Sequence, residues 1–372
     1  MSSPHASESA NPSFAPTAAR PYIGGQALLE GVMMRSPHSF AMVCRRRGGE
    51  LVVRERPIED ERKGLRAVPF ARGVMALVES LKLGSEALKF STDILEQDLE
   101  QEEQEELAKK QAPSSLADKA KKAKDSSLST LAALSLPVIA LAAMEPDGPV
   151  TPPKEQESGA RKLASAAAVL LPLALFVAAP QAAANGVNKL FSLGLDIRSA
   201  PFQLITGAAK LSIVIGYMSL LRQIPDVRRM FQYHGAEHKT ISTYEAEQEL
   251  TVANARSKTT LHPRCGTTFL VMVAMVSVIV FSIISPFLPR IEGASGLTEN
   301  LMLFAMKLPF IPVIAGLTFE IQRVFARYCT TGPLRVLLWP GFLVQKITTI
   351  EPDDDQLEVA MAAMRATLYR EA

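Results

Sequence analysis

Two histidines and a glutamate within five consecutive residues form the part of this sequence best suited to chemistry. His234 and His238 are four residues apart, and Glu237 lies between them. On an α-helix, residues i and i+4 share a face, so the two imidazoles can reach one metal ion. Read as H-x-x-E-H, the stretch matches the inverted zinc-hydrolase pattern, in which both histidines bind metal and the glutamate is the general base. The motif predicts a metal-dependent hydrolase that uses a divalent ion, with zinc expected.

Four further side chains could complete the metal site. Glu245 lies about 20° from His234 on a helix that turns about 100° per residue, which keeps both on one face. His262 and Cys265 follow in the same polar stretch, which holds three of the five histidines of the chain. Glu320 comes many tens of residues later, as does the third ligand of soluble enzymes of the inverted type. We expect Glu245, His262 or Glu320 to be the third ligand, with Cys265 ranked behind them.

Three other interpretations of these residues stay open. The histidines could serve only as hydrogen-bonding side chains at a membrane boundary. His234, His238, His262 and Cys265 could form a closed structural zinc site, in which four protein ligands leave no position for water. The run that begins at Cys265 could be no more than a tight turn into the next helix. An open coordination position would favour an enzyme over these alternatives.

The elements that must position these residues include helices of membrane length. A helix needs about 20 apolar residues to cross the hydrocarbon of a bilayer. Four segments meet this condition, namely Leu163–Ala184, Phe202–Leu221, Thr268–Leu288 and Leu301–Phe319. A fifth, Leu128–Met144, is short and broken by a proline, so we expect it to be re-entrant, interfacial or peripheral. The predicted fold is mainly α, a polytopic membrane protein with about four transmembrane helices.

The distribution of lysine and arginine predicts how these helices are oriented. The loop 222–267, which carries the His/Glu cluster, holds seven of these residues, whereas 185–201 holds two and 289–300 holds one. The region before the first span and the segment after the last span are also rich in arginine. Because cytoplasmic loops carry the excess of positive charge, we expect the cluster and both termini to be cytoplasmic.

Residues 21–95 are predicted to form a small cytoplasmic region before the spans. Ser39–Arg46 and Glu50–Arg56 are strand-like and flank a Gly-Gly turn, which is typical of a β-hairpin. Pro69–Phe90 has the apolar spacing of an amphipathic helix. Pro21–Arg35 contains three glycines among apolar residues, which predicts a bent segment or a close backbone approach.

The remaining segments have simpler expectations. Residues 1–20 are rich in Ser, Pro and Ala, which predicts disorder. Residues 96–162 have the composition of a charged linker with an Ala/Pro-rich insert, and the transmembrane domain then covers 163–330. Within 331–372 we expect an interfacial segment around the single tryptophan, because an indole is favoured there. A short helix that begins after Pro352 would close the chain.

Composition excludes some classes of function. The formal net charge is +2 at pH 7 and 21% of residues are charged, which gives no sign of a nucleic-acid-binding protein. The mean hydropathy of +0.13 predicts membrane helices mixed with sizeable soluble parts. The three cysteines are far apart, which indicates free thiols and a reducing compartment. No secretory signal is expected, because the first 20 residues lack an apolar core. The expected partner is the lipid bilayer.

Short motifs spread over residues 21 to about 365 resemble one known family. They are Gly24-Gly25-Gln26-Ala27 with Glu30-Gly31-Val32-Met33, Pro69-Phe70-Ala71-Arg72-Gly73, Pro225-Asp226-Val227-Arg228-Arg229, His234-Gly235-Ala236-Glu237-His238-Lys239, His262 with Arg264-Cys265-Gly266, Phe319-Glu320, and Glu351-Pro352-Asp353-Asp354. Together they resemble the YqhQ-like family, bacterial multi-pass membrane proteins of unknown function that have been called predicted metal-dependent enzymes. The resemblance implies a protein of the bacterial cytoplasmic (inner) membrane and supports a metal role for His234, Glu237 and His238. It implies no substrate.

Two functions of different classes follow. The first is a membrane-bound metal-dependent hydrolase that acts at the cytoplasmic face on a peptide, lipid-linked or phosphorylated substrate. The second is a non-catalytic scaffold or regulator, in which the His/Glu/Cys cluster is structural and the arginine-rich hairpin recruits a partner. A transporter ranks last, because four spans with few charges inside them give little for a translocation path.

Overall fold

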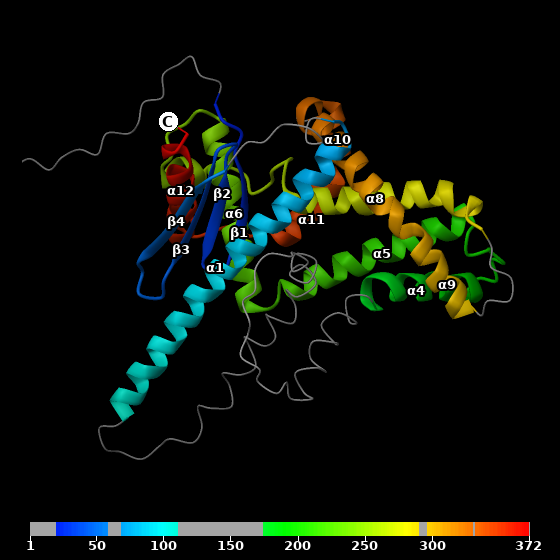
Figure 1. The fold of residues 1–372 in the computed structure, drawn as a ribbon, viewed down its shortest axis with the longest axis horizontal. Helices are drawn as coiled ribbons and strands as arrows, with labels where there is room; N and C mark the ends of the chain where they lie inside the picture. The colour runs from blue at the N-terminus through cyan, green and yellow to red at the C-terminus, as the bar shows by residue number, and fades with distance from the viewer. Residues whose placement is uncertain (1–19, 59–67, 111–173, 290–295, 330–331, 372) are drawn as a thin grey trace, which may run out of the picture.

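A computed structural model describes residues 20–58, 68–110, 174–289, 296–329 and 332–371. In these ranges the chain is mainly helical, with one small antiparallel sheet near the N-terminus (Figure 1). The predictions for Leu128–Met144 fall outside the described residues. So do nearly all of those for 1–20 and most of those for 96–162.

The sheet is a four-stranded meander in which strands β1 (Gly24–Leu28), β2 (Gly31–Arg35), β3 (Ser39–Arg45) and β4 (Leu51–Pro57) pair in chain order. The predicted hairpin is confirmed as β3 and β4, which pair antiparallel. The sequence did not predict β1 and β2. Four of the five residues of β2 are buried, so this strand lacks the alternation of a half-exposed one. The predicted close approach is confirmed, because a Cβ on Gly31 would lie 2.5 Å from the carbonyl oxygen of Val43.

Arginines of the sheet pair with two helices that pack beside it. Arg35 and Arg46 form ion pairs of 2.7 and 2.8 Å with acidic side chains of α1 (Ala71–Lys110). Arg45 pairs at 2.9 Å with Glu358 of α12 (Asp354–Tyr369). These arginines are therefore engaged inside the chain, which weakens the idea that they recruit a partner.

Helix α1 includes most of the predicted helix Pro69–Phe90 and continues well past it. Leu83, Ala87 and Ile94 on one of its faces are buried in a core shared with the sheet. After Asp98 most of its side chains are exposed, and this end of α1 points away from the rest of the chain in Figure 1. Glu, Gln, Lys and Leu dominate the extension, and these residues favour helix without tertiary support.

Three helical segments of the described chain are long and apolar enough to cross a membrane. The first is α5 (Ala200–Leu221), and the second joins α8 (Gly266–Ile284) to the short turn η3 (Ser285–Phe287). The third consists of α9 (Gly296–Lys307), η4 (Leu308–Phe310) and α10 (Ile311–Tyr328). They correspond to three of the four predicted spans. The fourth, Leu163–Ala184, reaches the described residues only through η2 (Ala174–Ala178) and the start of α4 (Ala179–Leu190).

Further helices connect and follow the spans. α6 (Pro225–Glu245) and α7 (Val252–Arg256) lie between α5 and α8. After α10 come η5 (Pro333–Leu338) and α11 (Trp339–Thr348). The closing helix α12 begins after Pro352, as predicted, and Asp353 caps it in a capping box with Gln356. Such a cap contributes about 1 kcal/mol.

The sheet, α6, α7 and α12 share one apolar core, and we call these elements the head. Its buried residues include Val32 and Met34 of β2, Tyr233 of α6, and Leu357 of α12. In Figure 1 the head gathers at one end of the molecule, and α4, α5, α8 and α9 extend at the other. Because α6 follows α5 directly, its H-x-x-E-H motif lies where the head meets the membrane helices.

Candidate metal centre

Helix α6 places the two histidines of the motif on one face. Pro225 in its first turn has the backbone angle that a helix start needs, and Asp226 complements the positive end of the helix dipole. The ring centroids of His234 and His238 are 4.4 Å apart. The prediction that the two imidazoles lie together is confirmed.

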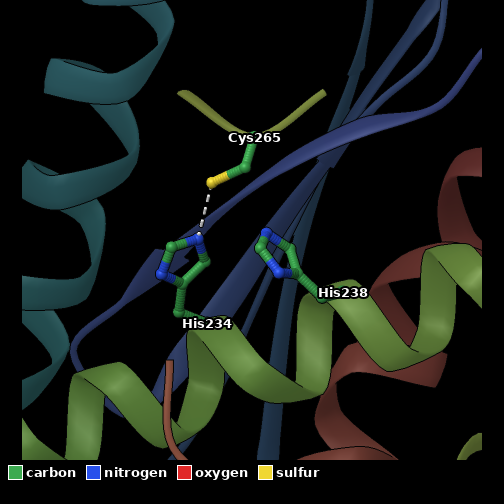
Figure 2. A group of neighbouring side chains, drawn as sticks. All are labelled: His234, His238 and Cys265. Carbon is green, nitrogen blue, oxygen red and sulfur yellow. Dashed lines mark hydrogen bonds between the residues drawn. The ribbon is translucent and has the colours of Figure 1, made fainter. Parts of the chain in front are cut away.

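His234 links the end of α11 to the start of α8. Its Nδ1 is 2.9 Å from the carbonyl oxygen of Thr348, so Nδ1–H is the donor of this bond. Its other nitrogen, Nε2, is 3.1 Å from Sγ of Cys265 (Figure 2). The ring is therefore held at one edge by backbone and faces the sulfur with the other.

His238 is held in the same way and has one free nitrogen. Its Nδ1 donates to the carbonyl oxygen of Thr260 at 2.5 Å. The side chain is almost fully buried, at 1% exposed. Its Nε2 is buried and has no hydrogen-bond partner in the described part of the chain. A buried lone pair without a donor is a position that an ion or a water can fill.

Cys265 adds a sulfur to the two rings. It is the N-cap of α8, where Sγ accepts a bond of 3.4 Å from the backbone nitrogen of Thr267. Its carbonyl oxygen accepts a bond of 3.4 Å from Gln322 of α10. One ring nitrogen of each histidine and Sγ of Cys265 all lie within 4.8 Å of one another. Figure 2 shows both rings extending from α6 toward this sulfur.

Glu237 lies next to this group and is 5% exposed. Its Oε2 has no hydrogen-bond partner among the residues described. Strand β1 leaves room for it, because a Cβ on Gly25 would lie 2.8 Å from Cγ of Glu237. Burial raises the pKa of Glu237 to about 7, against the opposing effect of the two imidazoles. A carboxyl group with this pKa can accept and return a proton near neutral pH.

The pKa values of His234 and Cys265 shift in opposite directions. Burial alone would favour the neutral imidazole, but the sulfur of Cys265 outweighs it and raises the pKa of His234 to about 9. Burial also opposes ionisation of the thiol, yet His234 and His238 hold the pKa of Cys265 well below its usual range. The pair therefore favours a thiolate, the form of cysteine that binds metal.

The ring of His262 lies beside that of His238, and Glu245 in turn lies beside His262. The ring centroids of His238 and His262 are 5.6 Å apart, and His262 is 5% exposed. Nε2 of His262 is 3.4 Å from a carboxylate oxygen of Glu245, which also forms an ion pair with Arg264. Burial lowers the pKa of His262 to about 4. The fold thus places His262 beside the cluster, whereas Glu245 bonds to residues around it.

Glu320 lies in α10 and links that helix to α1. Its carboxylate accepts two bonds from Arg72 of α1, at 2.6 Å from Nε and 2.5 Å from Nη2. The backbone nitrogen of Phe70 donates a weaker bond of 3.4 Å to the same group. In the part of the chain that the structure describes, the metal-type cluster consists of His234, His238 and Cys265, without Glu320.

Several residues that shape this site were missed by the sequence analysis. The carbonyl groups of Thr260 and Thr348 orient the rings, but a backbone oxygen leaves no signal in the residue type. Gly235 was a weak indication of close packing, because a glycine inside a helix lowers helix stability by about 1 kcal/mol relative to alanine. A Cβ there would lie 2.1 Å from the carbonyl oxygen of Ile350. Gly235 therefore lets the segment after α11 pass close to α6.

These residues fit a divalent ion that prefers nitrogen and sulfur. Histidines that bind metal commonly donate their second ring N–H to a carbonyl, which fixes the tautomer. His234 and His238 both do so, and Nε2 of His238 and Oε2 of Glu237 are two buried atoms that lack a hydrogen-bond partner among the described residues. Zinc binds imidazole and thiolate, and three protein ligands are typical of zinc sites that keep an open position.

Comparison with known proteins gives a family but no activity. A family model described as "Protein of unknown function (DUF1385)" matches residues 68–370. The "Uncharacterized protein YqhQ" of Bacillus subtilis (strain 168) is 29% identical over 355 residues, which cover 95% of this chain and 94% of that protein. No solved structure matches. The resemblance to the YqhQ-like family is confirmed.

Proposed function

The chain belongs to the family described as Protein of unknown function (DUF1385), and we propose that it is a membrane-bound metal-dependent hydrolase. The ion is zinc, bound by His234, His238 and Cys265. The observation that carries the proposal is that Nε2 of His238 and Oε2 of Glu237 are both buried and unpartnered beside the sulfur, among the described residues. An unmade hydrogen bond of this kind costs roughly 1–3 kcal/mol. A bound ion and a water would remove that cost.

Each residue of the centre has its own role. His234 and His238 bind through Nε2, because Nδ1 of each is engaged by a carbonyl. Cys265 provides the thiolate. A bound zinc ion lowers the pKa of a water toward neutrality. Glu237 would then hold a proton taken from the water and pass it to the leaving group, and its pKa of about 7 suits both transfers.

The position of the centre favours a substrate at the membrane surface. Cys265 directly precedes Gly266, the first residue of a candidate span. Val336 of η5 and Trp339 of α11 are 61% and 54% exposed, which suits contact with lipid at the interface. We propose a peptide, lipid-linked or phosphorylated substrate that reaches the centre along this surface.

We also propose that four helices cross a bacterial cytoplasmic membrane and that the head and both termini lie in the cytoplasm. The sheet packs against α6 and α12, so these elements lie on one side of the membrane. An even number of crossings must then separate β4 from α6, and α5 supplies one of them. Because η2 and α4 pack along α5, we assign the other crossing to the helix that ends at Leu190. The arginine-rich loop before α8 favours the cytoplasmic side.

Metal analysis of the purified full chain tests the centre. We expect about one zinc per chain in the wild type and less than about a tenth of that in the His234→Ala, His238→Ala double variant, because both nitrogen ligands are lost. His38→Ala is the matched control, since His38 is exposed and outside the cluster. Full zinc retention in a folded double variant would refute the assignment.

The position of His262 favours a second candidate, a structural zinc site closed by four ligands in a scaffold protein. His262→Ala separates the two, because it should lose the ion only if the site is closed. Glu237→Gln separates them again. This variant should keep the ion in either case. When it replaces the wild-type gene, the cellular function should be abolished if the protein is a hydrolase and should stay intact if the protein is a scaffold.

A further inference from the structure

A second polar cluster lies at the end of the spans opposite the metal centre, where α5 begins. Arg198, in the loop before α5, is 3% exposed. Its Nη1 donates to the carbonyl oxygens of Leu288 and Pro289, at 2.7 and 2.5 Å. Its Nε is buried and has no hydrogen-bond partner among the described residues. The guanidinium is thus fixed between the start of α5 and the end of η3, with one donor unused.

Two lysines from different helices interact electrostatically further along the spans. Nζ of Lys307, the last residue of α9, donates to Oε1 of Gln203 at 2.8 Å and lies 5.1 Å from the ring centroid of Phe281. Gln203 is 4% exposed, and its amide nitrogen donates to the carbonyl of Ile197, which fixes its oxygen toward Lys307. Lys210, two turns further along α5, is near enough to act electrostatically on Lys307.

Two hydroxyl groups of the same region are also buried without a partner in the described ranges. They belong to Ser282 and Ser285, and Ser285 is 0% exposed. Ser282 follows the phenylalanine that Lys307 contacts. Ser285 lies three residues before Leu288, whose carbonyl binds Arg198. These unused donors therefore lie on segments that the cations touch.

The charge of this cluster is unbalanced. Arg198 has a carboxylate partner, Glu299, at 3.4 Å. No described carboxylate forms an ion pair with Lys210 or Lys307. A lysine inside the hydrocarbon is costly and is normally paired. Gln203 takes one of the three donors of the Lys307 ammonium and brings no negative charge. Within the described ranges, the two lysines therefore have no anionic partner.

We propose that this cluster binds a phosphate group, either as free phosphate or in the headgroup of a lipid. Lysine ammonium groups bind phosphate as point charges, and the serine hydroxyls and the unused Nε of Arg198 offer further donors to its oxygens. Arg198 and Gln203 lie within one turn of the start of α5, a depth that a lipid headgroup or a small ion reaches from the far surface, whereas Lys210 lies almost three turns in. This site is separate from the metal centre and does not depend on it.

Thermal unfolding of the full chain in dodecyl maltoside micelles, which contain no phosphate, tests the site. One arm adds inorganic phosphate and the other adds phosphatidylglycerol, each against chloride at equal ionic strength. At about ten times the dissociation constant, the wild-type midpoint should rise by about 2 °C or more in at least one arm. A rise in the first arm alone identifies free phosphate as the ligand, and a rise in the second alone identifies the lipid.

Variants connect this rise to the two lysines. Lys210→Gln with Lys307→Gln should abolish it, while Lys210→Arg with Lys307→Arg, which keeps the charges, should retain it. Lys189→Gln, an exposed lysine at the end of α4, is the matched control and should respond as the wild type. Equal responses in the wild type and the glutamine variant, or no response of the wild type in either arm, would overturn the proposal.

Discussion

At the scale of single residues, the tautomers of two histidines decide what the cluster can bind. Thr348 and Thr260 accept from Nδ1 of His234 and His238, so Nε2 is the nitrogen of each ring that can offer a lone pair to an ion once the ring is neutral. One ring nitrogen of each histidine lies within 4.8 Å of the sulfur of Cys265. The sequence predicted that the histidines lie together. It could not predict the ring orientation, because backbone oxygens far along the chain determine it.

The same residues predict a proton release on zinc binding. The pKa of His234 is about 9, so its imidazole is protonated at pH 7, and His234 and His238 hold the pKa of the Cys265 thiol well below its usual range. Zinc needs a neutral imidazole, so binding at pH 7 should release about one proton. Zinc affinity should then rise roughly tenfold per pH unit and level off above the pKa of His234. Calorimetry in two buffers of different ionisation enthalpy measures this release. An affinity that is flat between pH 7 and 9 would contradict the ionisation states assigned here.

At the scale of elements, local patterns predicted more than tertiary packing did. The hairpin β3–β4 follows from strand-like segments around a Gly-Gly turn, the three apolar spans follow from hydropathy, and the start of α12 follows from its position after Pro352, which are all local signals. Strands β1 and β2 were not predicted, because they are buried by α6 and α12, which lie far along the chain. Glu320 illustrates the same limit. Nothing in the sequence indicated which residue would pair with its carboxylate. In the structure the partner is Arg72, from a helix about 250 residues earlier.

The proposed crossings predict which positions share a side of the membrane. Cysteines introduced at Val53 and Ser257, both exposed, should react with an impermeant maleimide in inside-out vesicles and not in spheroplasts. Leu193→Cys, in the exposed loop between α4 and α5, should show the reverse. The native cysteines are buried, so background labelling should be low. Labelling of Val53→Cys on the same side as Leu193→Cys would exclude an even number of crossings before α6.

At the scale of the whole molecule, the candidate metal centre lies at the junction of the head and the membrane helices. Helix α6 gives the histidines and the glutamate, the start of α8 gives the cysteine, and the end of α11 gives the carbonyl that orients His234. An ion at this point would tie these segments together. The phosphate cluster that we propose lies at the other end of the same helices, so the two sites can be tested separately.

X-ray absorption at the zinc edge, on the full chain loaded with one equivalent of zinc, tests the central claim most directly. We predict one sulfur at about 2.3 Å and two imidazole nitrogens at about 2.0–2.1 Å, with a lighter ligand in the fourth position. Cys265→Ser should remove the sulfur signal. Cys329→Ser should keep it, because Cys329 is buried in a different cluster. A zinc shell without sulfur, or one that Cys265→Ser leaves unchanged, would contradict the account.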